Sequence, residues 1–149
     1  MGTHYFDHHA SEANKFLTEL AIELQAPDNV RKAERILKAV LHTLRDRLGI
    51  QESFQFMAQL PLFLKGMYVT EWKYGKAPSE IKHLQEFIDA VKSKNRTTGE
   101  EDFGDHDHSI FLIKKVFKAL GHYISPGEWQ DIMDNLPKEL HALIKPALT

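Results

Sequence analysis

The chain has 149 residues, of which 42% are hydrophobic and 27% charged, with a formal net charge of −2 and no cysteine. This composition is typical of one ordinary globular domain. The lack of a clustered basic excess argues against nucleic acid as a partner, and the lack of cysteine excludes disulfides, thiolate nucleophiles and cysteine-type zinc sites. We also find neither an apolar run long enough to span a membrane nor a signal-peptide pattern at Met1–Phe6, so we expect a cytoplasmic protein without a membrane partner.

The first half of the chain has apolar residues at helical spacing. A helix of about four turns is expected around the apolar residues at positions 10–20. One apolar stripe then predicts a long amphipathic helix with a polar opposite face: Ala33, Ile36, Leu37, Val40, Leu41, Leu44 and Leu48. Asp28 is the expected N-cap of that helix, and Gly49 its stop. A short helix near 51–59 ends at Leu60-Pro61, because a residue that precedes proline is pushed out of the helical conformation, and Pro61 opens another helix.

The second half repeats this pattern. Helices are expected over residues 81–91 and 107–123. Ser125 and Glu128 have capping-box spacing around Pro126 and predict a short helix to about residue 135. Leu136-Pro137 interrupts it, and a last short helix runs through residue 144. Residues 73–78 and 94–104 are expected to be loops, and no alternating pattern predicts a strand.

The two halves align without a gap over residues 33–68 and 109–144. A shift of 76 residues gives eight identical pairs: Lys38/Lys114, Val40/Val116, Leu44/Leu120, Glu52/Glu128, Met57/Met133, Leu60/Leu136, Pro61/Pro137 and Leu64/Leu140. An ungapped repeat indicates a duplicated helical unit. We therefore predict an all-α fold in which two tandem pseudo-symmetric repeats, residues 8–72 and 79–145, pack as one domain over 1–149, with a groove between them.

Two clusters of polar or aromatic residues are candidates for a site. Asp105-His106-Asp107-His108 offers four possible metal ligands in a row, but adjacent ligands do not all converge on one ion, and either aspartate also suits a helix N-cap. We assign no metal, cofactor or catalytic residue, because no nucleotide-binding, nucleophile or metalloprotease motif is present. The second cluster breaks the repeat after its first unit and is the candidate interaction patch: Lys65, Tyr68, Trp72, Lys73 and Tyr74. These residues could stack on a flat ligand or contact a protein partner. Alternatively, Tyr68 and Trp72, which are four residues apart, pack over the core between the two units.

Several segments resemble one known family. They are 40–48, 58–61, 65–68 with Trp72, 124–128 and 135–140. The resemblance is to the DUF2267 family of small bacterial helical proteins of unknown function, and it covers nearly the whole chain. It implies a helical, cytoplasmic bacterial protein and supplies no catalytic residues. Residues 94–107 match nothing in this resemblance and are expected to be an insertion.

Two hypotheses of different classes follow. In the first, the protein is a non-enzymatic helical module that binds another protein or itself through the Tyr68/Trp72 patch. In the second, the groove between the repeats binds a small molecule or metal ion, with or without an enzymatic step. We favour the first hypothesis, because the usual signatures of catalysis are missing.

Overall fold

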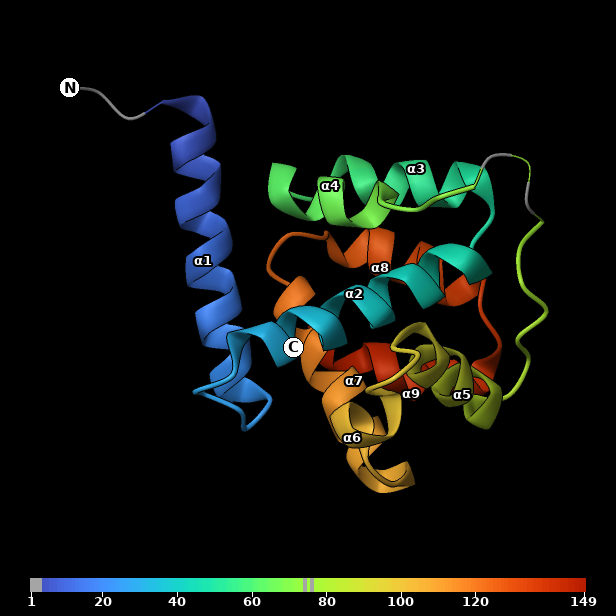
Figure 1. Ribbon diagram of the computed structural model, residues 1–149. Helices are drawn as coiled ribbons and strands as arrows, with labels where there is room; N and C mark the ends of the chain where they lie inside the picture. Colours follow the sequence, from blue (N-terminus) through green and yellow to red (C-terminus); the bar gives the residue numbers. More distant parts are fainter. Residues whose placement is uncertain (1–3, 74, 76) are drawn as a thin grey trace.

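The computed structural model describes residues 4–73, 75 and 77–149, and within them the fold is all-helical, with no strand. Figure 1 shows the arrangement of the helices. The α-helices are α1 Tyr5–Glu23, α2 Val30–Arg47, α3 Ile50–Ala58, α4 Leu62–Val69, α5 Leu84–Lys94, α6 Gly99–Phe103, α7 His106–Leu120, α8 Pro126–Asp134 and α9 His141–Ile144, with 3-10 turns η1 Lys138–Leu140 and η2 Lys145–Leu148 beside α9. The predicted fold class is confirmed.

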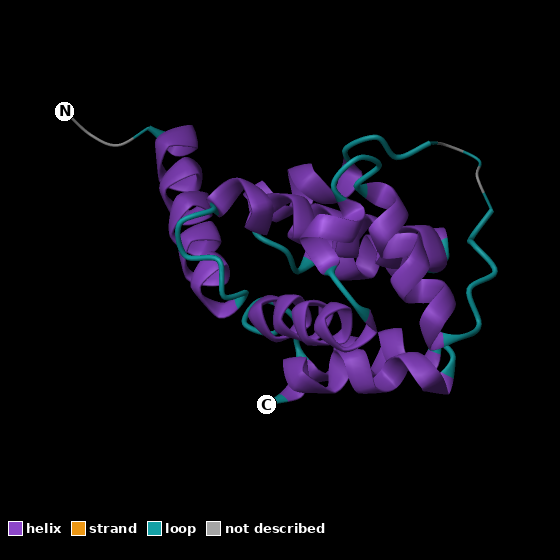
Figure 2. Ribbon diagram, turned by 60° about the horizontal axis from the view of Figure 1, so that its bottom comes forward, coloured by secondary structure: helices purple, strands orange, loops and turns teal. Residues whose placement is uncertain are grey.

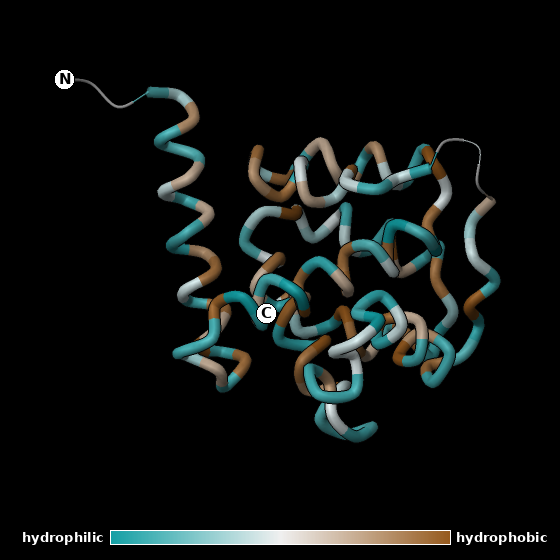
Figure 3. The backbone as a smooth tube through the Cα atoms, in the orientation of Figure 1, coloured by the Kyte–Doolittle hydropathy of each residue, from teal (hydrophilic) through white to brown (hydrophobic). Residues whose placement is uncertain are grey.

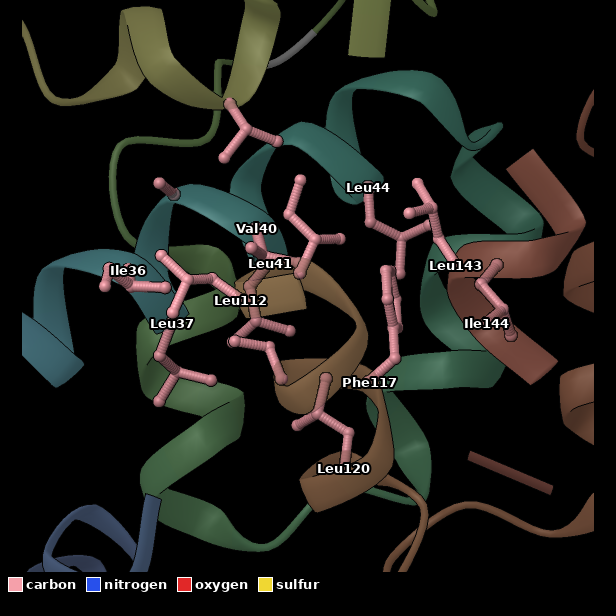
Figure 4. Close-up of a cluster of buried hydrophobic side chains, with 14 of the residues drawn as sticks. Ile36, Leu37, Val40, Leu41, Leu44, Leu112, Phe117, Leu120, Leu143 and Ile144 are labelled. Atoms are coloured by element: carbon pink, nitrogen blue, oxygen red, sulfur yellow. The ribbon is translucent and has the colours of Figure 1, made fainter. Parts of the chain in front are cut away.

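Helix α2 lies at the centre of the core. It packs against α1, α4, α5, α6 and α7, and every residue of its predicted apolar stripe is buried. Figure 4 shows the α2 side chains Leu37, Leu41 and Leu44 beside Leu112 and Phe117 of α7. A helix with one apolar face must bury that face, and the central position of α2 does so against several neighbours.

The two Leu-Pro breaks occur where the sequence predicts them. Pro61 is the N-cap of α4, and Pro137 is the N-cap of η1, which continues into α9. Helices α3 and α8 have bounds that differ by the same 76 residues as the sequence repeat. The packing of the chain as two pseudo-symmetric units stays a prediction.

Two local expectations are wrong. Asn29, not Asp28, caps α2, because its side-chain oxygen accepts the Lys32 N–H at 3.1 Å while Asp28 lies in the preceding turn. The expected loop at 94–104 contains α6, a one-turn helix whose residue Asp102 is buried against α2 through Arg35. Local turn signals such as Gly99 and Gly104 do not reveal a short helix that a distant arginine stabilises.

The beginning of α1 and the segment after α4 lie at the edge of this core. The N-terminal half of α1 is exposed and only Phe16, Leu20 and Ala21 of that helix are buried. Figure 3 shows hydrophobic and hydrophilic residues alternating along its turns. Residues 70–83, which we call the linker, connect α4 to α5, and their described parts, 70–73, 75 and 77–83, contain no helix (Figure 2). No helix in the described part of the chain has the length and apolar character needed to cross a membrane.

Candidate functional site

A broad groove lies between the linker and the helical body. Its floor is the polar face of α2, one end is the start of α3, and the other end is the turn after α5. The groove has a volume of about 1230 Å³. We call it the linker groove, because described linker residues line one side of it. Figures 1 and 2 show the linker between α4 and α5.

The floor of the linker groove is fixed by two α2 side chains that bind the C-terminal end of α4. Arg45 Nη1 donates to the carbonyl oxygens of Tyr68 at 2.9 Å and Thr70 at 2.7 Å. His42 Nε2 lies 2.7 Å from the carbonyl oxygen of Met67 and therefore carries the proton that it donates. The last carbonyls of a helix have no partner within it, so these side chains terminate α4 and fix where the linker begins.

The next residues of α2 hold the other end of the linker. The Asp46 carbonyl oxygen accepts the Ser79 N–H at 2.7 Å, and Arg47 Nε donates to the Ile81 carbonyl oxygen at 2.9 Å. Three consecutive residues at the end of α2 thus anchor the linker at both ends. The sequence Arg45-Asp46-Arg47 is therefore the structural support of the groove.

The linker groove is strongly cationic. Its described lining includes six cationic side chains and two carboxylates, a formal excess of four positive charges in a chain of net charge −2: Arg35, Lys38, Arg45, Lys73, Lys94 and Arg96 against Asp46 and Glu71. Burial raises the pKa of the Asp46 carboxyl, but the hydrogen bond from Lys94 and the charges of Lys94 and Arg45 outweigh it and hold that pKa below its ordinary value. Lys38 binds Glu71 at 2.7 Å and likewise lowers the pKa of that exposed carboxyl. Both acids are therefore ionised at neutral pH. Arg35 pairs with Asp102 outside the lining at 2.8 Å, and the other five cations still outnumber the two acids.

Aromatic and aliphatic side chains line the α3 end of the groove. Trp72 is half-buried, with its ring centroid 6.1 Å from that of Phe54 and 5.8 Å from the Arg45 Cζ. Phe54, Ile50 and Val69 also line the groove and are 56%, 59% and 43% exposed. Exposed apolar side chains gathered beside a cationic surface are typical of a binding surface.

The structure divides the predicted interaction patch. Trp72 and Lys73 line the linker groove. Tyr68 is fully buried, its hydroxyl 2.8 Å from the Ser53 Oγ and its ring in edge contact with Trp72, so the core interpretation applies to it. Lys65 is half-buried on α4 and is not part of the groove lining, and Tyr74 lies outside the described residues.

The histidine-rich stretch before α7 is engaged in local contacts. Asp105 is the N-cap of α7 and accepts the His108 N–H at 2.9 Å. His106 Nδ1 lies 2.8 Å from Gln85 Oε1, and the His108 ring stacks on Phe111. His4 and His8 have the four-residue spacing of helical metal ligands, but His8 contacts Glu12 at 3.0 Å. None of these histidines belongs to a three-ligand group among the described residues.

Sequence reasoning gives His42 and Arg45 no role, although both are buried at the floor of the groove. One sequence signal marks this region. In the repeat alignment Arg45, Asp46 and Arg47 fall on Gly121, His122 and Tyr123. The two repeats therefore differ at the α2 residues that bind the linker. The linker itself follows only the first repeat.

This arrangement defines a small all-helical protein with a surface groove and no recognisable catalytic constellation among the described residues. The chain belongs to the family described as "Uncharacterized conserved protein (DUF2267)", whose profile matches residues 13–143. The match includes residues 94–107, so that stretch lies inside the family region. No curated protein matches the chain.

Proposed function

We propose that the protein is a binding module whose linker groove takes up an acidic segment of a partner protein that also carries apolar side chains. The observation that carries this proposal is the local excess of positive charge beside exposed Ile50, Phe54 and Val69. Complementary charge steers a partner to the groove, and desolvated aromatic contacts supply most of the affinity.

The shape of the groove favours a peptide over a compact metabolite. Its volume of about 1230 Å³ is above that of ordinary small-molecule pockets, which are about 300–1,000 Å³. The groove also extends along α2, with Phe54 of α3 at one end and Arg96, beyond α5, at the other. The apolar end favours a peptide over a nucleic acid, because phosphate recognition requires cations and not exposed Ile50 or Val69.

The test is fluorescence anisotropy with short labelled peptides that are rich in glutamate, with and without one phenylalanine. We expect the phenylalanine-containing peptide to bind more tightly, and its affinity to fall as ionic strength rises. Trp72→Ala and Arg96→Glu should each weaken binding more than about tenfold. Lys118→Glu, an equal charge reversal at an exposed position of α7, is the matched control and should bind as the wild type does.

Circular dichroism of each variant establishes that the helices persist. The proposal fails if no acidic peptide binds, or if Lys118→Glu weakens binding as much as Arg96→Glu. It also fails if a single-stranded oligonucleotide binds as tightly as the best peptide, both to the wild type and to Trp72→Ala. A small anion that displaces the peptide equally well from the wild type and from Trp72→Ala would instead support the ligand-binding hypothesis.

A further inference from the structure

A second cluster of charged groups lies outside the linker groove, where α3 packs against α8. Glu52 of α3 and Glu128 and Asp131 of α8 each offer a carboxylate oxygen, and these three oxygens lie within 4.8 Å of one another. Two further contacts join the helices: the Ser125 N–H donates to Gln59 Oε1 at 2.7 Å, and Asn135 Nδ2 donates to Glu52 Oε2 at 3.3 Å. The start of each helix thus meets the end of the other, so α3 and α8 run antiparallel with the carboxylates between them.

The Glu128 carboxylate does not accept the Ser125 N–H, the partner that the capping-box spacing predicts. In a complete capping box its carboxylate would accept the Ser125 N–H. Here the Ser125 hydroxyl accepts the Glu128 N–H at 3.2 Å, but the Ser125 N–H donates to Gln59 instead. The Glu128 carboxylate is turned toward Glu52 and Asp131, and its side chain is only 6% exposed.

The buried oxygens of this cluster lack partners. Within the described chain, Glu128 Oε1 and Glu52 Oε1 are both inaccessible to solvent and have no hydrogen-bond partner. No described lysine, arginine or histidine forms an ion pair with any of the three carboxylates. Buried carboxylates are normally paired, hydrogen-bonded or bound to a metal ion, so the unpartnered Glu128 oxygen is a candidate ligand for a cation.

We propose that Glu52, Glu128 and Asp131 bind a divalent cation that bridges α3 and α8. The donors are all carboxylate oxygens, which suit the hard cations Mg²⁺, Mn²⁺ and Ca²⁺, and the cluster contains neither the imidazole nor the thiolate that copper or zinc prefers. Asp131 is exposed, so its side of the site is open to the water molecules that complete the coordination of these ions.

A proton competes with the cation for the same oxygen. Burial, together with the negative charges of Glu52 and Asp131, raises the pKa of Glu128 to about 7 in the metal-free protein.

The test is calorimetric titration of the full chain, stripped with chelator and dialysed, with MgCl₂, MnCl₂ and CaCl₂ in turn at slightly alkaline pH. We expect at least one of them to bind with one ion per chain and a dissociation constant below about 1 mM. Glu128→Gln and Asp131→Asn should weaken that binding more than about tenfold, since each removes a charged ligand. Glu101→Gln, the same change at an exposed position of α6, is the matched control and should bind as the wild type does.

Glu128→Gln removes a buried charge without changing the shape of the side chain, so the variant should fold, which its thermal unfolding checks. The proposal is overturned if none of the three cations binds, or if Glu101→Gln and Glu128→Gln bind equally. It is also overturned if the only species that the wild-type cluster takes up is a proton near neutral pH, because the site would then be a shared-proton carboxyl pair. Trp72→Ala should leave cation binding unchanged, which separates this site from the linker groove.

Discussion

Arg45 Nη1 donates to the Thr70 carbonyl oxygen at 2.7 Å, a contact between the last turn of α2 and the residue that ends α4. The same nitrogen donates to the Tyr68 carbonyl oxygen at 2.9 Å, and the guanidinium lies beside the Trp72 ring. One buried side chain thus closes a helix, begins the linker and positions the aromatic residue of the proposed binding surface. The stability of the fold and the shape of the linker groove therefore depend on the same contacts.

Arg45→Met should destabilise the protein by about 2–3 kcal/mol. Methionine fills most of the same space but leaves two buried or partly buried carbonyl oxygens without a donor, which costs more than the loss of an ordinary exposed hydrogen bond. Urea unfolding measures the change. Arg31→Met, at an exposed position of the same helix, is the control and should stay within about 0.5 kcal/mol of the wild type.

His42 should make the stability depend on pH below 6.5. Burial lowers its pKa from the ordinary 6.5, aided by the charges of Arg45 and Lys38 and opposed by the hydrogen bond to Met67. The unfolded state therefore binds the proton more readily. The contribution of His42 is fully present above pH 6.5 and is lost as the pH falls through the folded-state pKa.

The variant His42→Gln keeps a donor for the Met67 carbonyl oxygen but does not titrate. Its free energy of unfolding should therefore fall less steeply than that of the wild type as the pH is lowered from 6.5. Urea unfolding at several pH values gives both slopes. Equal slopes for variant and wild type would show that the imidazole is not held neutral by its surroundings.

Tyr68→Phe should cost about 1–2 kcal/mol, because the Ser53 hydroxyl would lose its buried partner at 2.8 Å. The double variant Tyr68→Phe/Ser53→Ala removes both polar groups and should be less destabilised than the sum of the single variants. Thermal and urea unfolding of all four proteins complete the cycle. Additive effects would mean that the two hydroxyls do not interact.

Asp102→Asn should destabilise the protein by about 2–3 kcal/mol. The Asp102 side chain is buried and accepts hydrogen bonds from Arg35, Thr98 and Asn95. Asparagine would replace one of the accepting oxygens by an NH2 group, which cannot accept these bonds. Glu101→Gln, on the exposed side of the same short helix, should have almost no effect. A neutral result for Asp102→Asn would indicate that α6 does not support α2.

The fold was largely predictable because the decisive signals are local. The apolar stripe from Ala33 to Leu48 predicts α2 and its buried face, and Leu60-Pro61 and Leu136-Pro137 predict where the following helices are interrupted. The site was predicted only in part. Trp72 and Lys73 line the groove, but the burial of Tyr68 and the roles of His42 and Arg45 depend on residues about 25 positions away.

Side-chain periodicity and proline geometry act within a few residues, so the sequence alone predicts the long helices, both Leu-Pro breaks and the family, but not the short helix α6. Which charged residues meet depends on how the helices pack. Glu52 and Glu128 form one of the eight identical pairs of the repeat, but nothing in the alignment indicates that they face each other between α3 and α8. Whether a charged residue is solvated, paired or buried is set by the segments packed around it, and those segments are distant in sequence.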